Sequence, residues 1–333
     1  MLKTQLCRNI GIEYPIFSAG LGVDIAGVEL TAAVSNAGGC GVLGMGGMPA
    51  AYTSQQIKRL RGLTGKPFGV NILLPLLRNG QIEACLEEAI PILVFFWGDP
   101  SPYVKEAHRR GVKVFVQVGS VEEAVAAADA GVDAIIAQGV EAGGHVKSTT
   151  SLSVIVPAIA AAIKPIPVIA AGGIANGQGL VSALALGAQG VSMGTRFMCS
   201  DEANAAQEYK DLVTQSRAED TVYTGLFDVG WPEAAHRVLR NTAVKEWEAA
   251  GCPRPGQRHG ESDIIGTATI AGQAVNYARY AVFPPVPDFR GDIAHAALYA
   301  GESCALVHDI KPAARIMREM VHEAGQIIAQ LRK

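Results

Sequence analysis

Residues 134–145 read AIIAQGVEAGGH, residues 167–174 read PVIAAGGI and residues 190–197 read GVSMGTRF. Each stretch opens with a short, almost continuous apolar run that leads into glycine. Continuous runs of this length are typical of parallel strands covered on both faces, whereas half-exposed strands alternate apolar and polar residues. The three stretches therefore predict buried parallel strands that end in tight, glycine-rich turns.

The same kind of run occurs five more times upstream. The eight predicted strands are Pro15–Gly20, Gly41–Gly46, Phe68–Leu74, Ile92–Gly98, Val112–Gly119, Ala134–Gly139, Pro167–Gly173 and Gly190–Phe197. The segments between them have helical spacing, as at Val121, Ala124, Val125 and Ala128. Eight strand–helix units in about 200 residues predict an α/β fold of the (β/α)8, or TIM barrel, type.

An open, doubly wound sheet is the alternative fold. It would be expected to carry a G-x-G-x-x-G fingerprint between an early strand and its helix. No such fingerprint is present, and the glycines at residues 38–41 precede a strand instead of following one. The pattern therefore favours the barrel.

The alternation of strands and helices stops near residue 200. Charged, helix-like segments follow at Asn204–Arg217 and Glu233–Ala250, and Lys311–Lys333 returns to an amphipathic helical pattern. We expect three parts: a barrel at residues 1–203, an inserted, mainly helical subdomain that covers the substrate at residues 204–300, and a return to the barrel at residues 301–333.

Composition and charge argue against several classes of protein. A net charge of −3 does not suit a protein that binds nucleic acid or a membrane surface. No apolar run reaches the roughly 18 residues of a spanning helix, and the N-terminus is too polar for a signal peptide. The six cysteines form no C-x-x-C pair, which indicates a reduced, cytoplasmic enzyme. No histidines or carboxylates stand at metal-ligand spacing.

Glycines after the seventh and eighth predicted strands are candidates for phosphate binding. In a (β/α)8 barrel the ligand binds at the C-terminal ends of the strands. Successive backbone N–H groups in glycine turns, together with the start of a following helix, can hold a phosphate there. The alternative is that these glycines only make tight turns. The candidate residues are Gly172, Gly173, Ser192, Met193, Gly194 and Thr195.

Two amides and one histidine stand at other strand ends. Asn71 and Gln138 can donate to and accept from the edge of a flavin ring, although they can equally well cap exposed strand ends. His145 follows Gly143 and Gly144, and it is the one histidine of seven in a glycine-rich loop at a strand end. With an ordinary pKa near 6.5, its ring can take or give a proton at neutral pH. A purely structural histidine is the alternative.

Four segments, taken in order, resemble the nitronate monooxygenase (2-nitropropane dioxygenase-like) family. They are residues 138–145, residues 167–174, residues 193–197 with Glu202 and Ala203, and residues 299–303. The resemblance implies a metal-free, FMN-dependent oxidoreductase that converts an alkyl nitronate and O2 into a carbonyl compound and nitrite. It implies that His145 is the catalytic residue. It also implies flavin contacts at Asn71, Gln138, Gly143, Gly173 and Ser192–Thr195, and the predicted cofactor site also includes Ala19, Gly20, Gly144 and Gly172.

Two segments depart from that pattern. Residues 18–22 read SAGLG where the family often has an Ala-Pro-Met type of turn over the flavin, and residues 146–150 read VKSTT, which is similar to FMN-dependent enoyl-ACP reductases. An NAD(P)H-dependent flavin reductase acting on an enoyl thioester or a quinone is therefore the alternative activity. A non-catalytic barrel that binds a phosphate-bearing ligand is a third hypothesis.

The expected partner is a small molecule: a nitronate or nitroalkane, or NAD(P)H under the alternative. Arg254, Arg258 and His259 crowd one loop of the insertion. They would suit the phosphate of a nucleotide or of phosphopantetheine, or they form an ordinary solvated loop. The sequence is also compatible with a homodimer.

Overall fold

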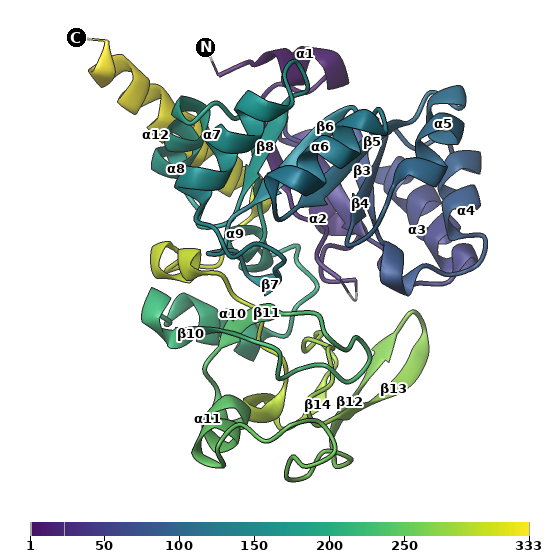
Figure 1. The fold of residues 1–333 in the computed structure, drawn as a ribbon, viewed down its shortest axis with the longest axis vertical. Coiled ribbons are helices and arrows are strands. Elements are labelled where there is room, and N and C mark those ends of the chain that lie inside the picture. The colour runs from purple at the N-terminus through teal and green to yellow at the C-terminus, as the bar shows by residue number, and fades with distance from the viewer. Residues whose placement is uncertain (1, 23, 333) are drawn as a thin grey trace.

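The computed structural model describes residues 2–22 and 24–332. Eight parallel strands form one sheet in the order β1-β9-β8-β6-β5-β4-β3-β2. The sheet and its helices make up the upper part of the molecule in Figure 1. Their bounds are β1 Ile16–Ser18, β2 Gly41–Gly44, β3 Phe68–Leu73, β4 Ile92–Phe96, β5 Lys113–Val118, β6 Ala134–Gln138, β8 Val168–Ala171 and β9 Gly190–Met193. All eight lie within the runs predicted from the sequence, so the predicted strands are confirmed.

The two edge strands of this sheet meet and close it. Phe17 of β1 forms a parallel bridge with Cys40, directly before β2, and the Cys40 N–H donates to the Ile16 carbonyl at 2.9 Å. Helix α2 (Val28–Asn36) packs so closely here that a Cβ on Gly41 would lie 2.0 Å from the Thr31 carbonyl oxygen. Only glycine fits at that position. The closed ring of strands confirms the barrel and excludes the open sheet.

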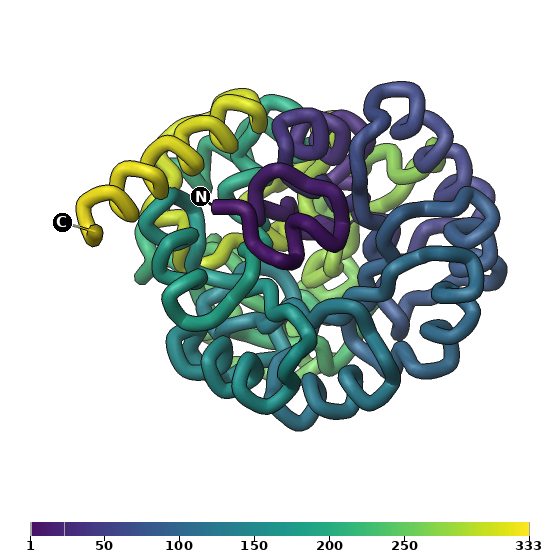
Figure 2. The backbone as a smooth tube through the Cα atoms, turned by 90° about the horizontal axis from the view of Figure 1, so that it is seen from above, coloured from purple at the N-terminus to yellow at the C-terminus, as the bar shows by residue number. Residues whose placement is uncertain are grey.

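Helices surround the strands as a ring (Figure 2). Their bounds are α2 Val28–Asn36, α3 Ala50–Leu63, α4 Gln81–Glu87, α5 Ser101–Arg109, α6 Val121–Asp129, α7 Leu152–Ala162, α8 Gly177–Ala185 and α12 Ala313–Leu331. Helix α12 packs against α8 and α2, so the C-terminal segment lies against the barrel. None of the helices in residues 2–22 and 24–332 has both the length and the apolar character of a membrane span.

The barrel interior is filled by side chains from the strands and is plugged at its N-terminal end by α1 (Gln5–Ile10). Leu6 and Cys7 of α1 belong to the same buried cluster as Phe17 and Phe115. Figure 2 shows this N-terminal segment lying across the centre of the ring. The opposite end of the barrel, where the strands terminate, is therefore the end that can hold a ligand.

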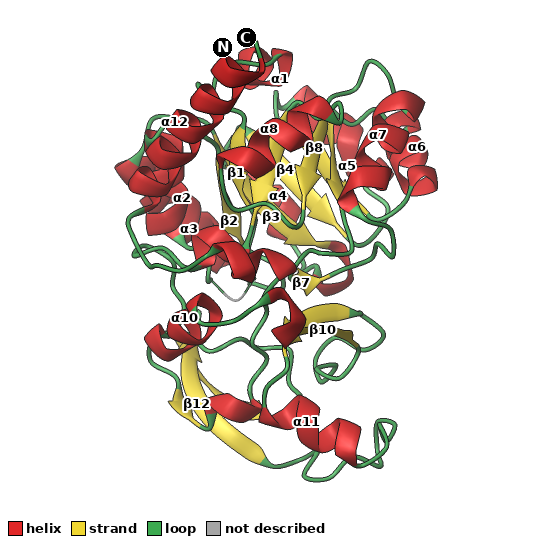
Figure 3. Cartoon of the chain, turned by 90° about the vertical axis from the view of Figure 1, so that its left-hand side faces the viewer, coloured by secondary structure: helices red, strands yellow, loops and turns green. Residues whose placement is uncertain are grey.

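Residues 204–300 cover that opposite end, and they are not mainly helical (Figure 3). Helices α10 (Gln207–Thr214) and α11 (Thr242–Ala249) lie inside the two predicted helical segments. The same region also contains β10 Thr221–Thr224, β11 His236–Leu239, β12 Ile264–Ile270, β13 Gln273–Ala278 and β14 Arg290–Gly291. The prediction of a mainly helical insertion is thus wrong.

The physical reason is a β-hairpin, formed by β12 and β13, whose turn lacks the common sequence signal. Strand β12 is rich in isoleucine and threonine, and β13 contains Val275 and Tyr277, all residue types that favour extended backbone. Ala271 and Gly272 join them with φ values of 50° and 77°, the left-handed backbone that two-residue hairpin turns require. Alanine seldom occupies such a turn, so the usual Asn-Gly or Asp-Gly signal is missing.

Candidate active site

A cavity of about 500 Å³ lies between the C-terminal ends of the barrel strands and the insertion. Its volume falls within the range of about 300–1,000 Å³ that small-molecule and cofactor sites occupy. Every site residue predicted from the sequence lines it: Ala19, Gly20, Asn71, Gln138, Gly143, Gly144, His145, Gly172, Gly173, Ser192, Met193, Gly194 and Thr195. The structure therefore brings all of these residues together in one cavity.

The turns after β8 and β9 expose backbone to this cavity. Gly172 and Gly173 have φ values of 113° and 67°, which residues other than glycine rarely adopt. The N–H groups of Gly173 and Ile174 find no acceptor within residues 2–22 and 24–332. Gly194 separates β9 from the one-turn helix α9 (Thr195–Met198). Unpaired N–H groups and missing Cβ atoms on one wall are suited to the phosphate of a cofactor.

Thr195 links this wall to the chain segment that follows the insertion. Its Oγ1 accepts a hydrogen bond of 3.0 Å from the Gly301 N–H. The Glu302 N–H donates to the Glu141 carbonyl at 3.0 Å, and a Cβ on Gly143 would lie 2.3 Å from the Gly301 nitrogen. Residues 299–303, part of the family-like pattern, therefore brace the loop that carries His145.

The two predicted amides have different surroundings. Asn71 is buried and donates weakly, at 3.3 Å, to the Val94 carbonyl, and a Cβ on Gly20 would lie 2.3 Å from the Asn71 Cβ. Gln138 already uses both ends of its amide: Nε2 donates to the His145 carbonyl at 2.9 Å, and Oε1 accepts from the Lys147 N–H at 3.2 Å. Gln138 thus positions the His145 loop, and one further donor and one lone pair remain on its amide.

The loop that carries His145 is also paired with the insertion. Gly144 and His145 form the short strand β7, which pairs antiparallel with β11 and places His145 opposite His236. The Val146 N–H donates to the Ala235 carbonyl at 2.9 Å. Gly144 has a φ of 75°, a left-handed conformation that leads into this pairing. The backbone around His145 is therefore held from both sides, by the barrel and by the insertion.

Aromatic rings surround the imidazole of His145. It stacks on Trp231 with 4.1 Å between ring centroids and 28° between planes, and the Tyr299 ring lies 5.5 Å away. Its Nε2 atom is buried and has no hydrogen-bond partner among the described residues. Burial lowers the pKa of His145 from 6.5 to about 3. The ring is therefore neutral at physiological pH, which differs from the ordinary pKa near 6.5 expected from the sequence.

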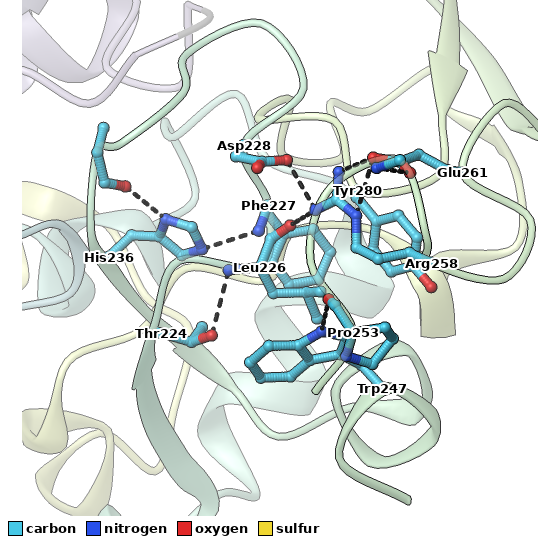
Figure 4. Close-up of polar contacts among 12 residues, drawn as sticks. Thr224, Leu226, Phe227, Asp228, His236, Trp247, Pro253, Arg258, Glu261 and Tyr280 are labelled. Carbon is cyan, nitrogen blue, oxygen red and sulfur yellow. Dashed lines mark hydrogen bonds and ion pairs between the residues drawn. The ribbon is translucent and has the colours of Figure 1, made fainter. Parts of the chain in front are cut away.

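His236 is held in one tautomer by the backbone around it (Figure 4). The Phe227 N–H donates to Nε2 at 3.1 Å, and the opposite nitrogen, Nδ1, lies 2.9 Å from the Ala234 carbonyl. Because an amide N–H only donates and a carbonyl only accepts, the proton must sit on Nδ1 and the ring must be neutral. Burial also lowers the pKa of His236. A neutral His236 beside His145 keeps the surroundings of the catalytic candidate uncharged.

Three of these aromatic residues were missed from the sequence: Trp231, His236 and Tyr299. Trp231 and His236 belong to the insertion and reach His145 only through the pairing of β11 with β7. No local pattern could have indicated that contact. Tyr299 did carry a signal, because it opens the family-like segment 299–303.

The cationic loop of the insertion lies outside the cavity, and its buried arginine is engaged within the insertion. Arg258 is buried: it donates to the Leu226 carbonyl at 2.9 Å, pairs with Asp228 at 2.8 Å and with Glu261, and lies over the Tyr280 ring (Figure 4). The guanidinium of Arg258 thus finds its hydrogen-bond acceptors and ion-pair partners inside the insertion. Neither Arg258 nor its exposed neighbours Arg254 and His259 line the cavity.

Replacing Arg258 with alanine is expected to destabilise the fold by about 3–5 kcal/mol, because it leaves two carboxylates without their buried partner. Urea unfolding of wild type and Arg258→Ala measures the difference. Arg254→Ala is the matched control: Arg254 is exposed in the same loop, and its removal should change the unfolding free energy by less than about 0.5 kcal/mol. Equal effects of the two substitutions would contradict a structural role for Arg258.

A family model described as nitronate monooxygenase matches residues 3–85 and 77–323 of this chain. A (3aS,4S,5R,7aS)-5-hydroxy-7a-methyl-1-oxo-octahydro-1H-indene-4-carboxyl-CoA dehydrogenase from Mycobacterium tuberculosis is 36% identical over 257 residues, covering 76% of this chain and 70% of that protein. A probable nitronate monooxygenase from Staphylococcus haemolyticus is 32% identical over 318 residues, covering 81% and 88%. The solved structure of FabK from Thermotoga maritima has a TM-score of 0.84 at 33% identity, covering 100% of this chain and 99% of that one.

Proposed function

Because this chain belongs to the nitronate monooxygenase family and is an oxidoreductase of that type, we propose that it binds FMN and oxidises alkyl nitronates with O2 to a carbonyl compound and nitrite. The observation that carries the proposal is the position of His145. Its neutral ring lines the same cavity as the glycine turns after β8 and β9. A base and a phosphate-binding wall in one cavity suit a flavin enzyme that acts on an acidic carbon.

The residues of the cavity fit FMN. Its phosphate would lie against Gly172, Gly173, Gly194 and Thr195, where the three glycines present no Cβ and the Gly173 N–H is unpaired among the described residues. Its ring system would lie near Asn71 and the turn that contains Ala19 and Gly20. Bound FMN would supply the acceptor for the two electrons of the substrate. One phosphate wall and no dinucleotide fingerprint favour FMN over FAD.

His145 would hold or move a proton at Nε2. That atom is buried and free of partners among the described residues, so it can accept the α-proton of a neutral nitroalkane without first losing another hydrogen bond. A nitronate has already lost this proton, and there the ring would orient the substrate. The stacked Trp231 limits the movement of the imidazole. Residues 204–300 would cover the substrate, since Trp231, Ile270 and Phe283 line the cavity from that side.

A reductase acting on a thioester substrate is the second candidate. It is favoured by the likeness to the CoA-ester dehydrogenase and by residues 146–150, which are similar to those of FMN-dependent enoyl-ACP reductases. The apolar residues Leu73, Leu76 and Val275 on the cavity wall would accept an acyl chain. In that reaction NAD(P)H, in place of a nitronate, would be the electron donor.

We expect the purified protein to release FMN on acid treatment and its bound flavin to bleach on anaerobic mixing with propionate 3-nitronate. Mass analysis of the released cofactor and stopped-flow absorbance measure the two steps. Bleaching by NADH or NADPH, with no response to the nitronate, would replace the proposed function with the reductase. Release of FAD, or of no flavin from folded protein, would contradict the assignment of the cofactor.

A further inference from the structure

Charge is nearly absent from the wall of the cavity. Among the described residues that line it, Arg78 is the single residue of the charged types Asp, Glu, Lys and Arg. Its side chain is exposed and forms no ion pair with the part of the chain that the structure describes. Its Nε–H donates to the Gly47 carbonyl at 3.2 Å, which leaves the other guanidinium N–H groups available. An unpaired cation at the edge of an uncharged cavity attracts anions.

Arg78 lies on the far side of the barrel from the proposed phosphate wall. It follows β3 and the short 3-10 helix η1 (Leu74–Leu76), whereas the phosphate wall follows β8 and β9. In the closed ring, β4, β5 and β6 separate β3 from β8 in one direction, and β2, β1 and β9 separate them in the other. A cofactor phosphate held at β8 and β9 therefore leaves Arg78 free for a different anion.

An apolar surface connects His145 with Arg78. Trp231 stacks on the His145 ring, and Leu73 and Leu76 pack against the buried cluster that contains Trp231. Leu76 stands two residues before Arg78 and also lines the cavity. An aliphatic chain that starts at His145 can thus run along apolar side chains until its far end meets the guanidinium.

We propose that Arg78 binds an anionic group at the far end of an aliphatic substrate whose reacting carbon lies at His145. The inference rests on the proposed function, because it assigns a substrate class to the same cavity. The anion is a carboxylate of the substrate itself or a phosphate of the carrier to which it is attached. Both present oxygens that a guanidinium can bind in pairs.

Kinetics with two nitronates of equal chain length test the carboxylate. For Arg78→Ala we expect the KM of propionate 3-nitronate to rise about 10-fold or more with kcat nearly unchanged, since a charge-assisted hydrogen bond to the substrate is lost. The KM of propyl-1-nitronate, which has no carboxylate, should stay within about 2-fold, and Arg78→Lys should recover part of the loss.

Arg61→Ala is the matched control. Arg61 is also exposed and also donates to backbone carbonyls, those of Glu88 and Ala89, but it does not line the cavity. Its removal should change neither KM. An equal rise of KM for both nitronates in Arg78→Ala would overturn the proposal, because it would show a general disturbance of the cavity.

Equilibrium binding, read by tryptophan fluorescence of the flavin-loaded protein, tests the anion without turnover. Wild type and Arg78→Ala are titrated with hexanoate against hexanol, and with 4′-phosphopantetheine against pantetheine. A loss of affinity confined to hexanoate identifies a carboxylate, and one confined to phosphopantetheine identifies a carrier phosphate. If neither nitronate is oxidised, the proposed function fails, and this titration alone decides the role of Arg78. Unchanged affinity for both anions would overturn it.

Discussion

Gly194→Asp is expected to give a folded protein that no longer holds its flavin. Gly194 has a φ of −93°, which any residue can adopt, and its added Cβ would meet the Leu21 side chain at 3.3 Å and the Ala19 Cβ at 3.9 Å. The fold should therefore tolerate the change. The new carboxylate would stand on the wall that we assign to the phosphate, and the one charged side chain of the described lining, Arg78, lies on the opposite side.

The size of the effect follows from like-charge repulsion. Two unit charges about 4 Å apart at an effective dielectric constant of about 20 repel by about 4 kcal/mol, or about 10³-fold in affinity. Gly194→Asn is the matched control, since its side chain has the same shape without the charge, and it should retain far more flavin. Flavin titration of the apoproteins measures both variants. Full flavin occupancy in Gly194→Asp would show that the phosphate binds elsewhere.

The barrel could be predicted because its strands are buried on both faces. Every residue of β6, Ala134–Gln138, is buried, so the sequence reads as one apolar run. Strand β12, Ile264–Ile270, mixes exposed, half-buried and buried residues, and it pairs with β13 through an Ala-Gly turn. The sequence of this hairpin carries neither a comparable apolar run nor a common turn signal. The helix content predicted for residues 204–300 was therefore too high.

The predicted site residues share one physical feature, which is their place at or just after the end of a parallel strand. The ends of parallel strands in a barrel meet at one face, so residues such as Asn71, His145 and Gly194 had to converge. Trp231 and His236 come from the insertion, and only the pairing of β11 with β7 brings them to His145. The lowered pKa of His145 follows from that packing, and hence no sequence pattern could have indicated it.

His145→Ala is expected to keep its FMN and to lose most of its turnover with a neutral nitroalkane. The contacts that hold the loop use backbone atoms: Gln138 binds the His145 carbonyl and the Lys147 N–H, and β7 pairs with β11 through the main chain. Alanine preserves all of them. Loss of a general base typically costs about 10²–10⁴-fold in rate. The loss should be smaller with a preformed nitronate, which has no α-proton left to remove.

The pH dependence gives a second, independent readout of the same residue. A pKa lowered to about 3 means that solvent protonates His145 only in strong acid, so the unprotonated ring is present throughout the range from about pH 5 to pH 8. The wild-type rate of flavin reduction by a nitroalkane should therefore show no loss of this base as pH falls through 6.5. A steep fall centred near 6.5 would mean that the ring is solvated and titrates normally when substrate binds.

Stopped-flow flavin reduction by nitroalkane, nitronate, NADH and NADPH separates the roles that His145 can have. His322→Ala is the control, because His322 is exposed on α12, far along the chain from the cavity lining. If the protein is a reductase, reduction by NAD(P)H should survive in His145→Ala while transfer to the acceptor slows, since the ring then acts on the acceptor. Rates equal to wild type with every donor and acceptor would leave His145 as a structural residue, stacked on Trp231 and without a part in the chemistry.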